Sequence, residues 1–119
     1  MAVTLYHNPR CSKSRQALAL LEERGVDVQV IEYLKTPPSA RELEAILQRL
    51  GVEPRELIRT KETAYTETGL ADSGLSRAQL IAAMVAHPIL IERPIAVNGP
   101  RAALGRPPER VLEIVEDKA

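Results

Sequence analysis

Aromatic side chains are scarce in this 119-residue chain, which holds three tyrosines and neither phenylalanine nor tryptophan. Proteins that bind single-stranded nucleic acids stack the bases on aromatic rings, so a chain this poor in them is a weak candidate for that class. An excess of charge of one sign is also lacking, because the chain has sixteen basic and sixteen acidic residues and its formal net charge is zero. This balance provides no electrostatic attraction to nucleic acid or to an anionic membrane surface.

Long apolar runs are also missing. No stretch approaches the roughly eighteen apolar residues that a membrane span requires. The N-terminus shows no apolar signal region either. We therefore expect a cytoplasmic protein that has no nucleic-acid partner and no membrane partner.

Cysteine occurs once, at position 11. A single thiol cannot form an internal disulfide or supply the thiolate cage of a metal site, so we expect no bound metal. What is present is typical of a globular protein, with 45% hydrophobic and 27% charged residues. The length fits one domain spanning residues 1–119, with a core of Leu, Ile, Val and Ala.

The surroundings of Cys11 favour a reactive thiol. The apolar run at 2–7 predicts a buried strand, and helical spacing predicts a helix at 12–23. Cys11 lies in the turn between them, where free backbone N–H groups and the positive end of the helix dipole stabilise a thiolate. Arg10, Lys13 and Arg15 add positive charge nearby. The alternative is that Cys11 is a small, inert apolar residue, as buried free cysteines often are.

The middle of the chain, about 39–87, should be helical. Two capping boxes open its longer helices, because a serine is followed three residues later by Glu or Gln. The predicted segments are a helix from Ser39 to Gly51, a short helix at 55–59, a polar loop with one helical turn at 60–74, and a helix from Ser76 to His87.

Short β-rich runs predict strands on both sides of this helical segment. The predicted segments are a strand at 28–33, a β-rich stretch at 89–97 interrupted at Pro94, a turn at Asn98–Gly99, a short strand at 101–105, and a final helix from Pro107 or Pro108 that carries Val111, Leu112 and Val115. A β-α-β unit requires parallel pairing, whereas a hairpin is antiparallel. The expected fold is therefore α/β and thioredoxin-like. It consists of a mixed four-stranded sheet flanked by helices, with the helical insertion between the β-α-β unit and a C-terminal β-β-α unit.

The residues around Cys11 limit the kind of thiol chemistry. Ser14 stands where a C-x-x-C enzyme has its second cysteine, so the loop cannot close its own disulfide. Ser14 either donates a hydrogen bond to the thiolate or satisfies a free helix N–H. His7 tunes the thiolate, holds the loop by hydrogen bonds, or is simply structural. A disulfide formed in turnover must join Cys11 to an outside thiol, and glutathione is the most available one in a cytoplasm.

Pro94 is the second candidate feature of a site. A proline at the start of a strand removes a hydrogen-bond donor from the sheet. In a thioredoxin-type fold this position takes a cis peptide bond next to the reactive thiol, which would direct Arg93 into the site. The alternative is an ordinary edge-strand proline beside a solvated arginine.

Motifs along nearly the whole chain resemble those of the glutaredoxin-linked arsenate reductases, the ArsC-type family with a thioredoxin-like fold. The matching segments, in order, are His7-Asn8-Pro9-x-Cys11, Tyr33-Leu34-Lys35-Thr36-Pro37-Pro38, Leu57-Ile58-Arg59, His87-Pro88-Ile89-Leu90-Ile91-x-Arg93-Pro94-Ile95 and Gly105-Arg106-Pro107. One difference is Ser12, where the family commonly has glycine. Because residue 12 opens the helix, a serine should be tolerated there.

The resemblance implies that Cys11 is the nucleophile and that Arg59, Arg93 and Arg106 bind the arsenate oxyanion. It also assigns supporting roles near the thiol to His7 and Ser14. Glutathione would be a co-substrate and glutaredoxin a protein partner, with no cofactor bound. Two alternatives stay open: a glutathione-dependent thiol oxidoreductase of unknown substrate, and a Spx-like regulator that binds RNA polymerase. The second typically uses a C-x-x-C switch, which this chain lacks.

Overall fold

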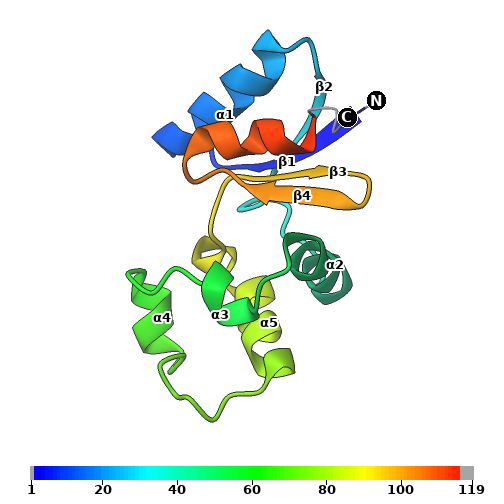
Figure 1. The fold of residues 1–119 in the computed structure, drawn as a ribbon. Coiled ribbons are helices and arrows are strands. Elements are labelled where there is room, and N and C mark those ends of the chain that lie inside the picture. The colour runs from blue at the N-terminus through cyan, green and yellow to red at the C-terminus, as the bar shows by residue number, and fades with distance from the viewer. Residues whose placement is uncertain (1, 116–119) are drawn as a thin grey trace. The chain divides into compact units, whose positions relative to one another are not determined.

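The computed structural model describes residues 2–115, and the chain divides into two compact units (Figure 1). The first unit consists of Met1–Thr36 and Arg93–Ala119, and the second of Pro37–Glu92. The predicted helical insertion, about 39–87, falls within the second unit. The expectation of one domain over 1–119 stays a prediction, and its residues 1 and 116–119 lie outside the described part of the chain.

The first unit contains the sheet. Its elements are β1 (Ala2–His7), α1 (Ser12–Glu23), β2 (Asp27–Glu32), β3 (Ile95–Asn98), β4 (Arg101–Leu104) and the 3₁₀ helix η2 (Pro108–Ile114). The strand order is β2-β1-β3-β4. Strand β1 runs parallel to β2 and antiparallel to β3, and β3 and β4 form an antiparallel hairpin. This mixed four-stranded sheet confirms the predicted α/β, thioredoxin-like fold.

Side-chain alternation in β1 explains how this sheet is covered. Val3 and Leu5 are fully buried and lie two residues apart, so they face the same side of the sheet. The same core contains Ala17 and Leu21 of α1 and Val111 of η2. Helices α1 and η2 therefore pack over one face of the sheet, as Figure 1 shows.

One prediction in the C-terminal half was wrong. The β-rich stretch at 89–97 begins as the 3₁₀ helix η1 (Pro88–Leu90), and Ile91 forms only an isolated bridge to Ile58. A short apolar run fits a strand or a buried helical turn equally well, so periodicity could not separate them. The final helix begins at Pro108, as predicted; it is 3₁₀ and ends at Ile114, one residue before Val115. Proline is favoured at this first position because its missing N–H would have no partner within the helix.

The second unit contains short helices: α2 (Ala40–Leu50), α3 (Pro54–Leu57), α4 (Thr63–Glu67), α5 (Arg77–Ala86) and η1. Both predicted capping boxes are present at the starts of α2 and α5. Gly51 ends α2 in the left-handed conformation, with φ of 70°, that favours glycine. Helix α5 packs against α2, α3 and η1. Burial of the apolar faces of these helices holds the unit together.

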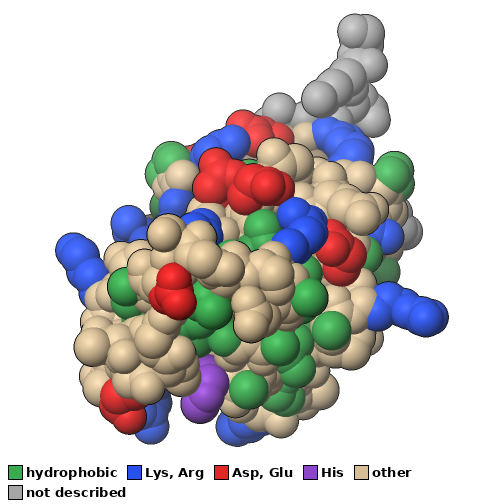
Figure 2. Space-filling model, turned by 90° about the horizontal axis from the view of Figure 1, so that it is seen from below, with side chains coloured by type: hydrophobic (Ala, Val, Ile, Leu, Met, Phe, Trp, Pro, Cys, Tyr) green, Lys and Arg blue, Asp and Glu red, His purple; other side chains and the backbone are tan. Residues whose placement is uncertain are grey.

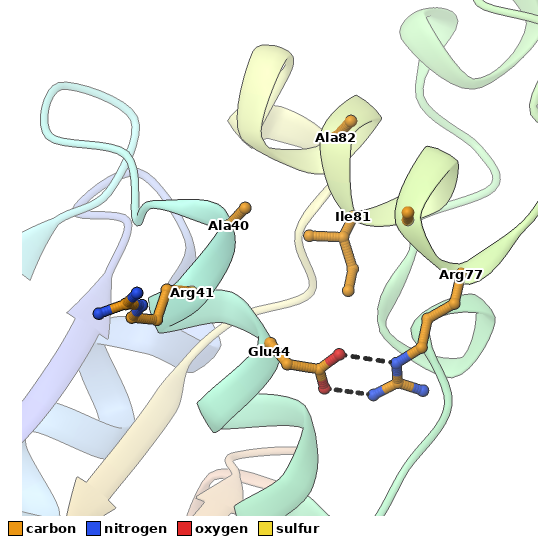
Figure 3. Close-up of a pocket in the computed structure, with 7 residues that line it drawn as sticks. Ala40, Arg41, Glu44, Arg77, Ile81 and Ala82 are labelled. Atoms are coloured by element: carbon orange, nitrogen blue, oxygen red, sulfur yellow. Dashed lines mark hydrogen bonds and ion pairs between the residues drawn. The ribbon is translucent and has the colours of Figure 1, made fainter.

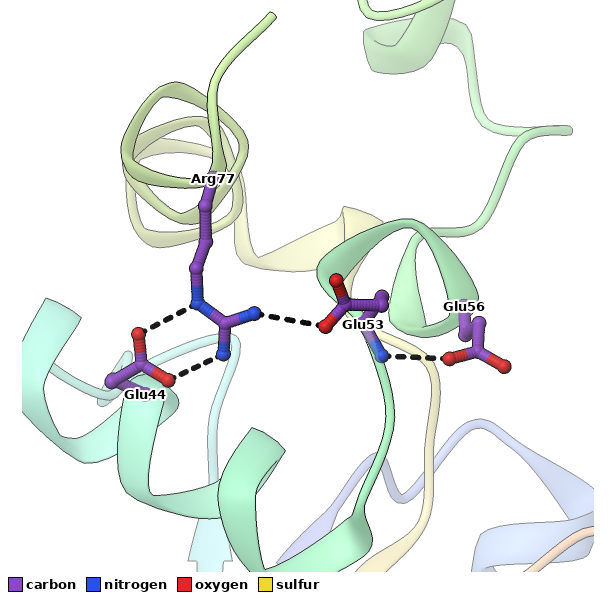
Figure 4. Close-up of polar contacts among 4 residues, drawn as sticks. All are labelled: Glu44, Glu53, Glu56 and Arg77. Carbon is purple, nitrogen blue, oxygen red and sulfur yellow. Dashed lines mark hydrogen bonds and ion pairs between the residues drawn. The ribbon is translucent and has the colours of Figure 1, made fainter.

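Arg77 connects the start of α5 to other parts of this unit. Its Nε and Nη2 donate to the two carboxylate oxygens of Glu44 on α2, at 2.8 and 2.5 Å. Its Nη1 donates to Glu53 at 3.1 Å, and Glu56 caps the backbone N–H of Glu53 (Figure 4).

A groove of about 460 Å³ between α2 and α5 is lined by Ile81, alanines, Arg41 and this Arg77–Glu44 pair (Figure 3). Its lining contains no thiol or imidazole and therefore no nucleophile of that kind.

Acidic and basic side chains are interspersed on the face shown in Figure 2, with hydrophobic side chains between them. This mixture agrees with the zero net charge of the chain. Among residues 2–115, no helix is both long enough and apolar enough to cross a membrane.

Candidate active site around Cys11

Cys11 is the N-cap residue of α1 and is half-buried, so part of the residue is accessible to solvent. The turn before it is held by its own hydrogen bonds. The backbone N–H of Cys11 donates to the Asn8 carbonyl at 3.0 Å, and that of Arg10 donates to the Asn8 side chain at 3.0 Å. Arg15 reaches back from α1 to donate to the Pro9 carbonyl at 2.8 Å. The turn therefore fixes the thiol at the start of the helix.

The surroundings of the sulfur lower the pKa of Cys11. Burial works against ionisation, but the backbone N–H of Ser14, the guanidinium of Arg93 and the backbone N–H of Lys13 together outweigh it and hold the pKa below its ordinary value. Two of these groups belong to the first turn of α1, as the sequence predicted. The third comes from a segment far along the chain.

Ser14 makes different contacts from the two that the sequence left open. Its hydroxyl oxygen accepts the backbone N–H of Asn8 at 3.0 Å and lies 2.6 Å from Nδ1 of His7. Ser14 and His7 are both buried. Burial lowers the pKa of His7, Glu32 raises it and Arg15 lowers it, and the net direction is downward. A neutral His7 and Ser14 therefore hold the turn behind the thiol, and only the backbone N–H of Ser14 acts on the sulfur.

Arg93 and Arg106 lie in the same unit as Cys11. The side chain of Arg93 faces the sulfur. Its Nε and Nη1 are buried, and they have no hydrogen-bond partner among residues 2–115. Nε of Arg106 donates to the backbone carbonyl of Arg93 at 3.0 Å, so the Arg106 guanidinium lies against the backbone of Arg93. Buried donors are normally paired, so unpaired ones beside a nucleophile indicate a place where an anion binds.

Pro94 follows a cis peptide bond, as the sequence predicted, and a second cis bond joins Arg106 to Pro107. No separate role was predicted for Gly105. In the structure it lies against Pro94. The backbone N–H of Gly105 donates to the Pro94 carbonyl at 2.8 Å. A Cβ atom on Gly105 would lie 2.6 Å from Cγ of Pro94 and 3.0 Å from Val111. Glycine is therefore required here by close packing.

Replacing Gly105 with alanine should destabilise the protein, because the added methyl group has to displace the ring of Pro94. Overpacking of this kind costs about 1–3 kcal/mol of unfolding free energy. Chemical denaturation would measure it. The matched control is Gly74→Ala in the second unit, where the new Cβ would meet only the Asp72 side chain at 3.3 Å. Equal stability of the two variants would contradict the packing role.

Arg59, the third predicted oxyanion ligand, belongs to the second unit. Its Nε donates to Glu62 at 3.1 Å and its Nη1 donates to Glu92 at 2.6 Å. Sequence reasoning missed both glutamates. The three-residue spacing from Arg59 to Glu62 could have suggested the first pair, whereas Glu92 is 33 residues away.

A cavity of about 320 Å³ lies beside the thiol-bearing turn. Its lining residues are His7, Asn8, Pro9, Arg10, Glu32, Leu34 and Lys35. Leu34 is 40% exposed, which is unusual for a large apolar side chain in this protein. The lining of the cavity carries mixed charge, because Lys35 forms an ion pair with Glu32 at 3.5 Å and Arg10 adds a further cation.

No cluster of three or more His, Cys, Asp or Glu side chains suited to a metal ion occurs within residues 2–115. The chemistry that these residues offer is that of an acidified thiol beside arginine donors. Such a site can bind a small oxyanion and attack it.

Comparison with known proteins agrees with this geometry. The family model described as the ArsC family matches residues 6–114. The Escherichia coli K12 protein "Uncharacterized protein YfgD" is 56% identical over 95% of this chain and 96% of its own length. An arsenate reductase of Haemophilus influenzae is 47% identical, covering 97% of this chain and 100% of its own. A solved structure of an arsenate reductase from Vibrio cholerae is 56% identical, with a TM-score of 0.93 over 96% of this chain and 98% of that one.

Proposed function

The chain belongs to the ArsC family, and from this premise we propose that it is an arsenate reductase, an oxidoreductase that converts arsenate to arsenite. The observation that carries the proposal is the pair of buried, unpartnered N–H donors of Arg93 beside the half-exposed, acidified Cys11. Relatives named arsenate reductase, at 47% identity over nearly the whole chain, support it.

Arsenate suits these groups because it is a tetrahedral oxyanion that is mostly dianionic at neutral pH. Arg93 offers two buried, unpartnered donors, Nε and Nη1, and Arg106 adds charge beside its backbone. The N-terminus of α1 adds further backbone N–H groups and its positive dipole end. We infer that these groups hold arsenate against the sulfur of Cys11. A further role of Arg59, in the other unit, stays a prediction from the family resemblance.

The proposed reaction begins when the thiolate of Cys11 attacks arsenic. A sulfur–arsenic bond forms, an arsenic–oxygen bond breaks, and the oxygen leaves as water after it takes up protons. The thiol of glutathione then attacks the sulfur of Cys11. The sulfur–arsenic bond breaks and its electron pair stays on arsenic, which passes from As(V) to As(III). The two sulfurs, oxidised together by two electrons, form a Cys11–glutathione disulfide.

Glutathione is proposed as the reductant because the chain contains one cysteine and cannot resolve a disulfide within itself. The cavity beside the turn is consistent with this choice, since Arg10 in its lining suits a carboxylate of a tripeptide thiol, whereas Lys35 there is paired with Glu32. Glutaredoxin would then reduce the mixed disulfide. Glutaredoxin as partner and a cytoplasmic location both stay predictions.

A coupled assay tests the proposal. Purified protein, arsenate, glutathione, glutaredoxin and glutathione reductase should together oxidise NADPH, and omission of arsenate or of this protein should remove the signal. Omission of glutaredoxin should reduce the rate, because the Cys11–glutathione disulfide then waits for exchange with free glutathione. Absence of any arsenate-dependent oxidation would reject the proposed activity.

A glutathione-dependent thiol oxidoreductase is the second candidate. The pairing of Arg59 with Glu62 and Glu92 favours it, because an arginine held by two carboxylates binds oxyanions less well. In the same assay, this alternative predicts reduction of a small mixed disulfide without any arsenate and no stimulation when arsenate is added.

A further inference from the structure

The cavity of about 320 Å³ beside the thiol-bearing turn lies where the two parallel strands of the sheet end. Strands β1 and β2 pair in register up to His7 and Glu32, the last residue of each strand, and both residues line the cavity. Ligands of α/β proteins commonly bind outside the carboxyl ends of parallel strands. Its volume also falls within the range of small-molecule sites. The cavity therefore has the position and the size of a ligand site.

The cavity adjoins the nucleophile along the chain. Asn8, Pro9 and Arg10 line it, and Arg10 is joined directly to Cys11. Neighbouring Cα atoms are only about 3.8 Å apart. All residues of the lining belong to the first unit, as does Cys11. A small thiol held in this cavity is therefore placed next to the residue that it has to attack.

The turn after β2 places two opposite charges in the lining. The backbone N–H groups of Lys35 and Thr36 donate to the Glu32 carbonyl at 2.9 and 3.0 Å. This turn brings Nζ of Lys35 to 3.5 Å from Oε1 of Glu32. The side chain of Glu32 is 43% exposed and that of Lys35 is 80% exposed, so a ligand in the cavity can reach both charges.

Two adjacent opposite charges match a ligand group that also carries both signs. A carboxylate and an ammonium can each form more hydrogen bonds than the single contact between Glu32 and Lys35 uses. The amino-acid end of a thiol such as glutathione is a zwitterion, with an ammonium for Glu32 and a carboxylate for Lys35. A simple oxyanion has no ammonium and would be repelled by Glu32. The lining therefore suits a reducing thiol better than it suits arsenate.

We propose that this cavity binds the external thiol of the reaction proposed above, on which the present inference rests, and that Glu32 and Lys35 recognise the ammonium and the carboxylate of its amino-acid end. The exposed side chain of Leu34 provides an apolar wall in the same lining. Arg10 pairs with a second carboxylate where the thiol has one. Glu32 and Lys35 determine the specificity for the reductant and take no part in the attack on arsenic.

Disulfide exchange at Cys11 tests this inference without arsenate. The thiolate of Cys11 attacks oxidised glutathione, a sulfur–sulfur bond forms to one glutathione, and the other leaves as a thiolate. Mass spectrometry of the mixed disulfide measures the rate. Glu32→Gln and Lys35→Gln should each slow this reaction about three- to fivefold, as expected for loss of one partly exposed ion pair.

Hydroxyethyl disulfide, which carries no charge, reports the reactivity of the sulfur itself. Neither Glu32 nor Lys35 is among the groups that shift the pKa of Cys11, so both variants should react with this reagent at the rate of the parent protein. If the variants slowed both reagents equally, the two residues would act on the thiol or on the fold, and the inference would be wrong.

Dithiodipropionate separates recognition of a zwitterion from attraction of an anion, because it carries carboxylates and no ammonium. Lys35→Gln should slow its reaction with Cys11. Glu32→Gln should accelerate it, because the variant removes a charge that repels the carboxylates. If Glu32→Gln also accelerated exchange with oxidised glutathione, the cavity would attract anions only, and recognition of the ammonium would be refuted.

Lys61→Gln and Glu67→Gln are the matched controls. They make the same changes of charge at exposed positions of the other unit and should leave the rates with all three disulfides unchanged. A loss of rate with oxidised glutathione in these controls would attribute the effect to net charge and contradict the cavity assignment.

The coupled assay provides a second readout. Glu32→Gln and Lys35→Gln should raise the KM for glutathione about three- to fivefold and leave the KM for arsenate unchanged. If the exchange rates shift as stated in a protein without arsenate-dependent activity, the cavity assignment stands and the proposed function fails. If arsenate is reduced but both variants react with oxidised glutathione as fast as the parent, the assignment is wrong and the proposed function stands.

Discussion

Replacing Cys11 with serine should reduce arsenate-dependent NADPH oxidation to the level of the assay without enzyme. Cys11 is the only thiol in the chain, so no other residue can take over attack on arsenic or form the mixed disulfide. A serine hydroxyl is barely ionised at neutral pH, and the neighbouring donors that suffice for a thiol cannot make it a nucleophile. Loss of an essential nucleophile typically costs at least about a thousandfold in kcat.

The Cys11→Ser variant should remain folded, because oxygen replaces sulfur at a half-exposed N-cap position where serine is favoured. Circular dichroism and thermal unfolding would establish this. Ser12→Ala, at the exposed next position, is the control and should retain activity. Measurable arsenate reduction by a folded Cys11→Ser protein would remove the thiol from the proposed mechanism.

The second large effect is expected at Arg93. Replacing it with methionine keeps much of the side-chain volume and removes the buried donors that face the sulfur. Loss of such a charge-stabilising donor should lower kcat/KM for arsenate by roughly 10²–10³-fold. The same substitution removes a group that lowers the pKa of Cys11, so that pKa should rise. The midpoint of the pH dependence of iodoacetamide alkylation should therefore move to higher pH.

Two further variants separate the effects of Arg93 on binding and on thiol acidity. Arg106→Met should weaken the use of arsenate but barely move the alkylation profile, since Arg106 is not among the groups that shift the pKa of Cys11. Arg41→Met, at an exposed position on α2, should change neither quantity. If all three variants used arsenate equally well, Arg93 and Arg106 would not be oxyanion ligands.

Local sequence signals predicted most of the fold because each depends on a few neighbouring residues. The capping serines of α2 and α5 and the left-handed Gly51 act over one helical turn. The apolar run of β1 and the helical spacing of apolar residues in α1 predicted the bounds of these two elements. The strand at 89–91 failed because Pro88 starts a helical turn, and burial of Leu90 and Ile91 satisfies an apolar run in either conformation.

The candidate site was predicted less completely because its contacts are distant in sequence. The turn around Cys11 is local, so the part of its acidity that comes from the helix start could be inferred; the cation that acts on the sulfur is the distant Arg93 and not the neighbouring basic side chains. By contrast, the distance from Gly105 to Pro94 and the bond from Arg59 to Glu92 depend on how separate segments pack. Charge patterning alone cannot tell that an arginine is already held by two carboxylates.

The path of the chain through its two units also determines which parts of the sequence can change independently during evolution. The chain leaves the first unit after Thr36 and returns to it at Arg93, so Cys11, Arg93 and Arg106 are all carried by one unit and Arg59 by the other. The groups that lower the pKa of Cys11 also belong to the first unit. Mutations within 37–92 can therefore accumulate in the inserted stretch while the residues that acidify the sulfur are inherited intact.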